Sequence, residues 1–150
     1  MSRAKFLRAL PYLLAAAGCN SDVPVSATAD LPWLGLSVTV TRTATHPFLA
    51  RFNLRLRMMG PNRCVATAEL FPDTGGVSRR NLYDDVQGRL ILVSQFDVRV
   101  FDPQPCSLSL QEFRWLGSDM RYLGVFDSDE EQVWKFFPAS VRTERAFERP

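Results

Sequence analysis

The stretch of sequence that decides the fold is residues 51–58, Arg-Phe-Asn-Leu-Arg-Leu-Arg-Met. Apolar side chains occupy the even positions, and polar side chains, including three arginines, occupy the odd positions. A period of two is typical of a β-strand with one buried and one solvated face. The register of this strand is well specified, because a slip of one residue would bury three guanidinium groups.

Similar alternation extends outward from this strand in both directions. In residues 89–101, the longest β-rich stretch, Leu90, Leu92, Phe96, Val98 and Val100 share one phase. The other segments expected to form strands are residues 34–41, 64–70, 106–110, 121–126 and 132–137. Short strands separated by turn residues favour an all-β fold, a two-sheet β-sandwich over residues 34–140. The charged tail, residues 141–150, is expected to fray or to dock loosely.

Composition and motifs limit the classes of protein to which this chain can belong. The chain has 150 residues, 46% of them hydrophobic, and its charges are nearly balanced, which indicates one folded domain. No two cysteines have the spacing of a zinc site or a thiol-redox motif, and neither a Gly-rich phosphate loop nor a G-x-S-x-G motif occurs. His46, the single histidine, is read as a surface residue, and the acidic residues 127–131 as a solvated turn rather than a calcium loop. We therefore expect no catalytic residues, no metal and no cofactor.

The N-terminus has the layout of an export signal. Residues 1–8 contain three basic residues and no acid, and an apolar run follows that is too short to span a bilayer. The run ends in Ala16-Ala17-Gly18-Cys19, which resembles a bacterial lipobox, in which the cysteine is acylated and the chain is cut before it. We expect residues 1–18 to be a signal peptide and residues 19–33 a lipidated N-terminus and tether. An ordinary signal cleaved near Cys19, or an N-terminal helix kept in the fold, are the alternatives.

Acylation of Cys19 would leave Cys64 and Cys106 in an oxidising compartment. These two cysteines can then pair as a disulfide, or remain two buried free thiols. Removal of residues 1–18 leaves 15 basic against 16 acidic residues, a net charge of −1. A nucleic-acid-binding protein normally carries a basic excess, so that class is excluded.

The arginines on the polar side of residues 51–58 are the strongest candidates for binding. Arg51, Arg55 and Arg57 form a row on one strand face. Such a row is either a solvated face paired with acids elsewhere or a docking face for an acidic partner, since arginine is well suited to interfaces.

The order of several short motifs resembles one family, the outer-membrane lipoproteins of type VI secretion systems, known as TssJ or SciN. The motifs follow the lipobox in the family's order, and they cover roughly residues 34–138. They are Pro47-Phe48-Leu49 with the strand that follows, Leu82-Tyr83-Asp84-Asp85, the turn at Pro103 and Pro105, Arg121-Tyr122-Leu123-Gly124-Val125, and Trp134-Lys135 with Pro138.

The resemblance implies a transthyretin-like sandwich with small helical additions, anchored by lipid at the periplasmic face of the outer membrane. It also implies that the protein assembles the secretion membrane complex by binding the periplasmic C-terminal region of a TssM-like inner-membrane protein. The family's first loop contributes to that contact, and by position it corresponds here to Thr43, Ala44, Thr45, His46 and Pro47. The alternative function is a small periplasmic lipoprotein that binds a soluble ligand or inhibits a periplasmic enzyme, which would require an apolar cavity.

Overall fold

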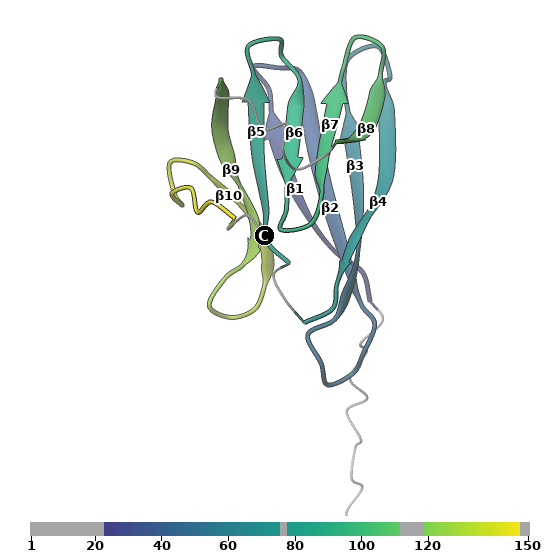
Figure 1. The fold of residues 1–150 in the computed structure, drawn as a ribbon, viewed down its shortest axis with the longest axis vertical. Coiled ribbons are helices and arrows are strands. Elements are labelled where there is room, and N and C mark those ends of the chain that lie inside the picture. The colour runs from purple at the N-terminus through teal and green to yellow at the C-terminus, as the bar shows by residue number, and fades with distance from the viewer. Residues whose placement is uncertain (1–22, 76–77, 112–118, 148–150) are drawn as a thin grey trace, which may run out of the picture.

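The computed structural model describes residues 23–75, 78–111 and 119–147. Over these residues the chain forms ten strands in two antiparallel sheets, which confirms the all-β, two-sheet sandwich (Figure 1). The small helical additions implied by the family resemblance do not occur within the described ranges. Nor does any described segment form a helix with the length and apolarity needed to cross a membrane.

One sheet is a simple meander of four strands in the order β1-β2-β3-β4, so every neighbouring pair is a hairpin. The strands are β1 (Val25–Leu31), β2 (Leu36–Ala44), β3 (Phe52–Met59) and β4 (Val65–Asp73). The alternation of residues 51–58 is confirmed, since Leu54, Leu56 and Met58 are buried while Arg55 and Arg57 are exposed.

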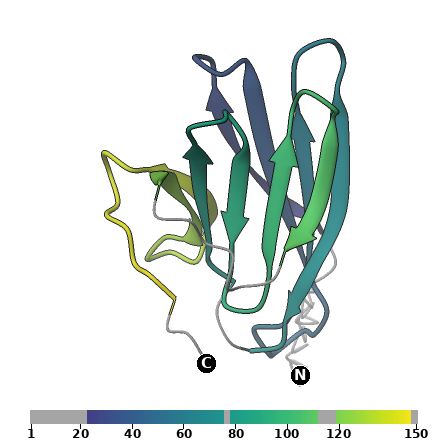
Figure 2. The same cartoon turned by 45° about the horizontal axis from the view of Figure 1, so that its top comes forward.

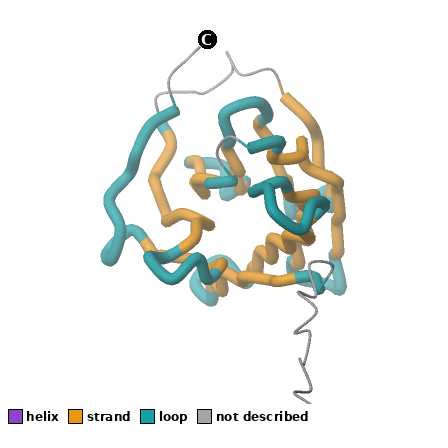
Figure 3. The backbone as a smooth tube through the Cα atoms, turned by 90° about the horizontal axis from the view of Figure 1, so that it is seen from below, coloured by secondary structure: helices purple, strands orange, loops and turns teal. Residues whose placement is uncertain are grey.

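The second sheet has six strands in the order β10-β9-β5-β6-β7-β8. They are β5 (Arg80–Asp85), β6 (Leu90–Val93), β7 (Val98–Asp102), β8 (Ser107–Gln111), β9 (Met120–Ser128) and β10 (Trp134–Pro138). The two layers face each other, with β1 beside β10 at one side and β4 beside β8 at the other (Figures 2 and 3).

The core lies between the sheets and takes apolar side chains from both. Val38 and Leu56 from the four-stranded sheet pack with Leu92, Phe101 and Phe126 from the six-stranded sheet, and each is almost completely buried. Burial of a side chain of this size stabilises the fold by about 1.5–3 kcal/mol, so this layer holds the sheets together.

The disulfide between Cys64 and Cys106 is formed, with the two Cα atoms 5.6 Å apart. Cys64 directly precedes β4 and Cys106 directly precedes β8, so the bond joins the two sheets. Of the two alternatives left open by the sequence, the structure thus confirms the disulfide and not a pair of free thiols.

The expected tether over residues 19–33 was wrong in its C-terminal part, because Val25–Leu31 forms the edge strand β1. The prolines at positions 24 and 32, with several small polar residues, argue against a helix in this segment but not against a strand. Both lie just outside the strand, where a missing N–H removes no hydrogen bond of the ladder. Ala27, Ala29 and Leu31 are buried, so the strand completes the core.

The single phase expected along residues 89–101 was also wrong. A tight turn divides the segment into β6 and β7, with the Ser94 N–H donating to the Asp97 carbonyl at 2.9 Å. After the turn the faces exchange: Leu90 and Leu92 point into the main core, whereas Val98 and Val100 join a second apolar cluster on the other face of the sheet. Phe96 lies in the turn and is exposed.

The charged tail packs against that second face of the six-stranded sheet as far as it is described. The Tyr83 hydroxyl donates to Glu144 Oε1 at 2.8 Å, and Asn81 Nδ2 donates to the Arg145 carbonyl at 2.9 Å. The Arg79 guanidinium lies 4.1 Å from the centre of the Phe147 ring. Burial, together with the hydrogen bond to Glu144, raises the pKa of the Tyr83 phenol, so this group stays protonated and continues to donate to the tail.

Candidate protein-binding face

The outer side of the four-stranded sheet gathers the polar residues that alternate with the core. Its centre is Arg55, which lies between Thr41 of β2 and Glu69 of β4, while Arg57 lies between threonines of both neighbouring strands. We call this surface the arginine face. It is made by Ser26 and Thr28 of β1, Thr39, Thr41 and Thr43 of β2, Asn53, Arg55 and Arg57 of β3, and Thr67 and Glu69 of β4.

Short hydroxyl side chains cover the β1–β2 half of the arginine face. Across the β1–β2 ladder, the hydroxyl oxygens of Ser26 and Thr41 lie 2.7 Å apart, and those of Thr28 and Thr39 lie 2.9 Å apart. Each pair shares a hydrogen bond, so neither member needs a partner protein to satisfy it. The longer arginine side chains on β3 therefore stand beside short polar side chains, so a second protein can reach them.

Within the arginine face as defined, Arg55 and Arg57 stand beside one carboxylate, Glu69, and Asp30 continues the outward series of β1 toward the other end of the sheet. Arg55 Nε pairs with Glu69 Oε1 at 2.6 Å, but the two side chains are 69% and 64% exposed. A pair this exposed contributes little to stability, so it can exchange partners at low cost. Among the described residues, no carboxylate lies within ion-pair distance of Arg51 or Arg57. The face is therefore suited to an acidic segment.

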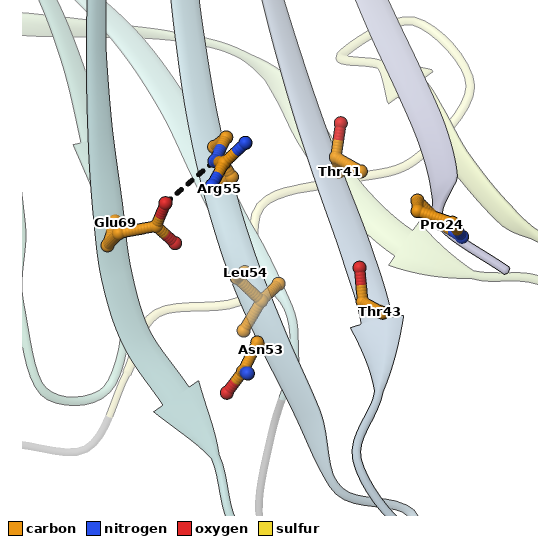
Figure 4. A pocket seen from close by; sticks show the side chains of 7 residues that line it. All are labelled: Pro24, Thr41, Thr43, Asn53, Leu54, Arg55 and Glu69. Atoms are coloured by element: carbon orange, nitrogen blue, oxygen red, sulfur yellow. Dashed lines mark hydrogen bonds and ion pairs between the residues drawn. The ribbon is translucent and has the colours of Figure 1, made fainter. Parts of the chain in front are cut away.

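A shallow depression of about 360 Å³ lies at one end of the arginine face (Figure 4). Its lining comes from three strands and from the residue before β1, and the Arg55–Glu69 ion pair crosses its edge. Because the depression lies on the outside of the sheet, it can receive a side chain of a docked segment but does not enclose a metabolite. The lining residues are Pro24, Thr41, Thr43, Asn53, Leu54, Arg55 and Glu69.

The loop between β2 and β3 is held in a defined conformation by His46. Its Nδ1 atom accepts hydrogen bonds from the backbone N–H groups of Phe48 at 3.1 Å and Leu49 at 3.0 Å. The Thr45 N–H donates to the Arg51 carbonyl at 2.9 Å and closes the loop. His46 is thus a hydrogen-bond acceptor that shapes the loop.

The residues predicted to bind a partner divide between the loop and the face. Thr43 and Ala44 end β2, residues 45–47 lie in the loop, and Arg51 immediately precedes β3. The structure brings Thr43 and Arg55 together around the depression, while Arg57 lies farther along the sheet, away from the loop. Cys19, the predicted lipidation site, lies outside the described residues.

Sequence reasoning missed Arg42, which ties the loop to the other sheet. Arg42 Nη1 donates to Ser128 Oγ and Nη2 donates to the Gln132 carbonyl, both at 2.8 Å. The guanidinium also lies 5.0 Å from the centre of the Trp134 ring. Burial lowers the pKa of Arg42, and Asp127 and Asp73 partly oppose that shift. The alternation along β2 could have revealed this, because position 42 follows Val38 and Val40 on the side of the strand that faces the core.

Residues 23–75, 78–111 and 119–147 place no group of three or more His, Cys, Asp or Glu side chains where a metal ion could be held.

No family model, curated protein or solved structure matches this chain. Function must therefore be inferred from the arginine face, the loop beside it and the N-terminal sequence.

Proposed function

We propose that the protein is a lipid-anchored assembly module with no catalytic role, of the kind found in the membrane complex of type VI secretion systems. Acyl chains on Cys19 hold it at the periplasmic face of the outer membrane. The arginine face, with the adjoining residues Thr43–Pro47 and Arg51, binds the periplasmic part of a TssM-like inner-membrane protein. The observation that carries this proposal is a row of exposed arginines on a rigid sheet, with Arg51 and Arg57 lacking carboxylate partners among the described residues.

The construction of the sheet supports this role. An interface gains affinity when its contact groups are already in position, because less conformational freedom is lost on binding. Arg55 and Arg57 project from the centre of a four-stranded sheet whose other side is the main core, and the disulfide ties β4 to the opposite sheet. Arginine is also enriched among residues that dominate binding energy at interfaces.

The packing between the sheets favours the assembly role over the ligand-binding alternative. A soluble ligand in this architecture needs a cavity between the sheets. That space is filled at its centre by Val38, Leu56, Phe101 and Phe126, each of which is fully buried.

The lipid anchor is tested by the Cys19→Ala variant. Without the thiol there is no acylation, and we expect the protein to move from the membrane fraction to the soluble periplasmic fraction, because no acyl chain remains to hold it in the bilayer. Fractionation with immunoblotting measures the distribution, and mass spectrometry of the wild-type N-terminal peptide measures acylation. Wild-type protein recovered without acyl chains, or a variant that stays on the membrane, contradicts the proposed anchor.

The arginine face is tested by Arg57→Glu, which replaces an attractive charge with a repulsive one on the proposed interface. We expect partner capture to weaken about tenfold or more, with unchanged thermal stability because Arg57 is exposed. The matched control is Arg63→Glu, an identical charge change at an exposed position in the β3–β4 turn at the other end of the sandwich. Equal weakening by both variants would mean that net charge, and not this face, governs binding.

A further inference from the structure

The tip of the β2–β3 loop exposes two large apolar side chains. Phe48 is 90% exposed and Leu49 is 48% exposed. The backbone N–H groups of both residues donate hydrogen bonds to His46 Nδ1, so the loop conformation holds both residues at the tip. Single exposed apolar residues are common, but two adjacent ones on an ordered tip are a feature that needs a partner surface.

The start of the described chain lies at the same end of the sandwich as this tip. Val25 pairs with Arg42, and Pro24 borders the same depression as Thr43, so the segment before β1 runs alongside the end of β2. Residues 45–51 continue past that level. In Figure 1 the β2–β3 loop projects beyond the sheets at the lower end, farther than the acidic β9–β10 turn.

Chain length limits how far this end can be from the bilayer if Cys19 is acylated. Val23 lies four residues after Cys19, and a fully extended chain spans about 3.5 Å per residue, so the two Cα atoms are at most about 14 Å apart. The lower end of the sandwich then lies close to the bilayer, and the described segment that reaches farthest at that end in Figure 1 is the β2–β3 loop, which exposes Phe48 and Leu49.

We propose that Phe48 and Leu49 insert into the interfacial layer of the bilayer that holds the acyl chains. This inference rests on the proposed lipid anchor and adds a second, non-covalent contact. Two points of attachment fix the tilt of the sandwich, so the strands stand away from the membrane and the arginine face looks sideways toward a partner.

The test is a depth measurement on the acylated, full mature protein in vesicles of phosphatidylethanolamine and phosphatidylglycerol. With Cys19 acylated and Cys64 bonded to Cys106, a cysteine introduced as Leu49→Cys is the only free thiol and takes a nitroxide label. The matched control is Val86→Cys, an apolar position that is 84% exposed on the β5–β6 turn at the opposite end. We expect the ratio of oxygen to nickel-chelate accessibility to be several-fold higher at position 49 than at position 86.

A second measurement needs no label. The double variant Phe48→Ser with Leu49→Ser should transfer between vesicles roughly tenfold faster than Val86→Ser, because it loses the apolar contacts of the tip. Equal accessibility at positions 49 and 86 in protein that floats with the vesicles overturns the inserted tip while leaving the anchor intact. Protein that is unacylated and does not float overturns the anchor and this orientation with it. A label at position 49 that is sheltered only when a partner protein is added would assign the tip to protein binding and overturn the membrane contact.

Discussion

Replacing Gly124 with alanine is expected to destabilise the domain by about 3 kcal/mol or more. Gly124 has a φ of +152°, which residues with a Cβ atom rarely adopt. A Cβ atom built there would lie 2.4 Å from the Phe137 carbonyl oxygen and 2.5 Å from the Phe136 ring. The carbonyl belongs to the paired strand β10, so the clash cannot be relieved by turning a side chain.

Gly124 is needed because a β-bulge lies beside it. Leu82 pairs with Gly124 but the next residue, Tyr83, pairs with Tyr122, which leaves Leu123 as the extra residue. The bulge exchanges the faces of β9. Tyr122 consequently packs on the second apolar cluster beside Tyr83, whereas Phe126 points into the main core.

Urea unfolding of the Gly124→Ala variant measures this effect, with Gly88→Ala as the matched control. Gly88 also has a positive φ, +76°, but nothing lies within 4 Å of a Cβ atom built on it. The control therefore measures only the loss of stability caused by placing a Cβ atom at a positive φ, which we expect to be about 1 kcal/mol. If the two variants lose the same stability, the close contact with β10 is not what requires glycine at position 124.

Removing the Cys64–Cys106 disulfide is expected to cost about 4 kcal/mol. The bond closes a loop with a sequence separation of 42 residues, and the chain-entropy model gives about this value for such a loop. It also lies where the four-stranded sheet meets the six-stranded sheet beside β4 and β8, a side held together by few other groups. Its loss should therefore loosen this side of the sandwich before the opposite side.

The double variant Cys64→Ser with Cys106→Ser measures this contribution by urea unfolding. Wild-type protein in reductant should match the double variant, and the double variant should not respond to reductant. If the wild-type protein unfolds at the same urea concentration with and without reductant, the bond contributes no stability and the entropic account is wrong.

The elements that sequence could predict are those with a single buried face. β3 alternates without interruption because one side is the core and the other is solvent, so its face and register follow from its residues alone. The edge strand β1 was hidden by flanking prolines and small residues, although its alanines alternate correctly. The candidate face was predictable for the same reason as β3, because exposed arginines must lie opposite the buried residues.

The middle of the six-stranded sheet could not be read in this way because β5 and β6 are buried on both faces. β6 is buried along its whole length, so no alternation marks which residues face the main core. The bulge at Leu123 reverses the phase within one strand, and only the pairing with β5 reveals it. Arg80 is 2% exposed, and its guanidinium donates hydrogen bonds to the carbonyls of Phe71, Ser78 and Arg79. Because arginine is rarely buried, the sequence alone would place this residue at the surface.

The central claim, that the arginine face captures a periplasmic partner, is tested most directly by photo-crosslinking in intact cells. A photoreactive residue at Thr43, in the depression, is compared with one at Gln87, exposed on the β5–β6 turn at the far end. We predict that Thr43 yields one major adduct, with the periplasmic region of an inner-membrane protein, and that Arg57→Glu lowers its yield about tenfold or more. No adduct at Thr43, or the same adduct from both positions, would contradict the account.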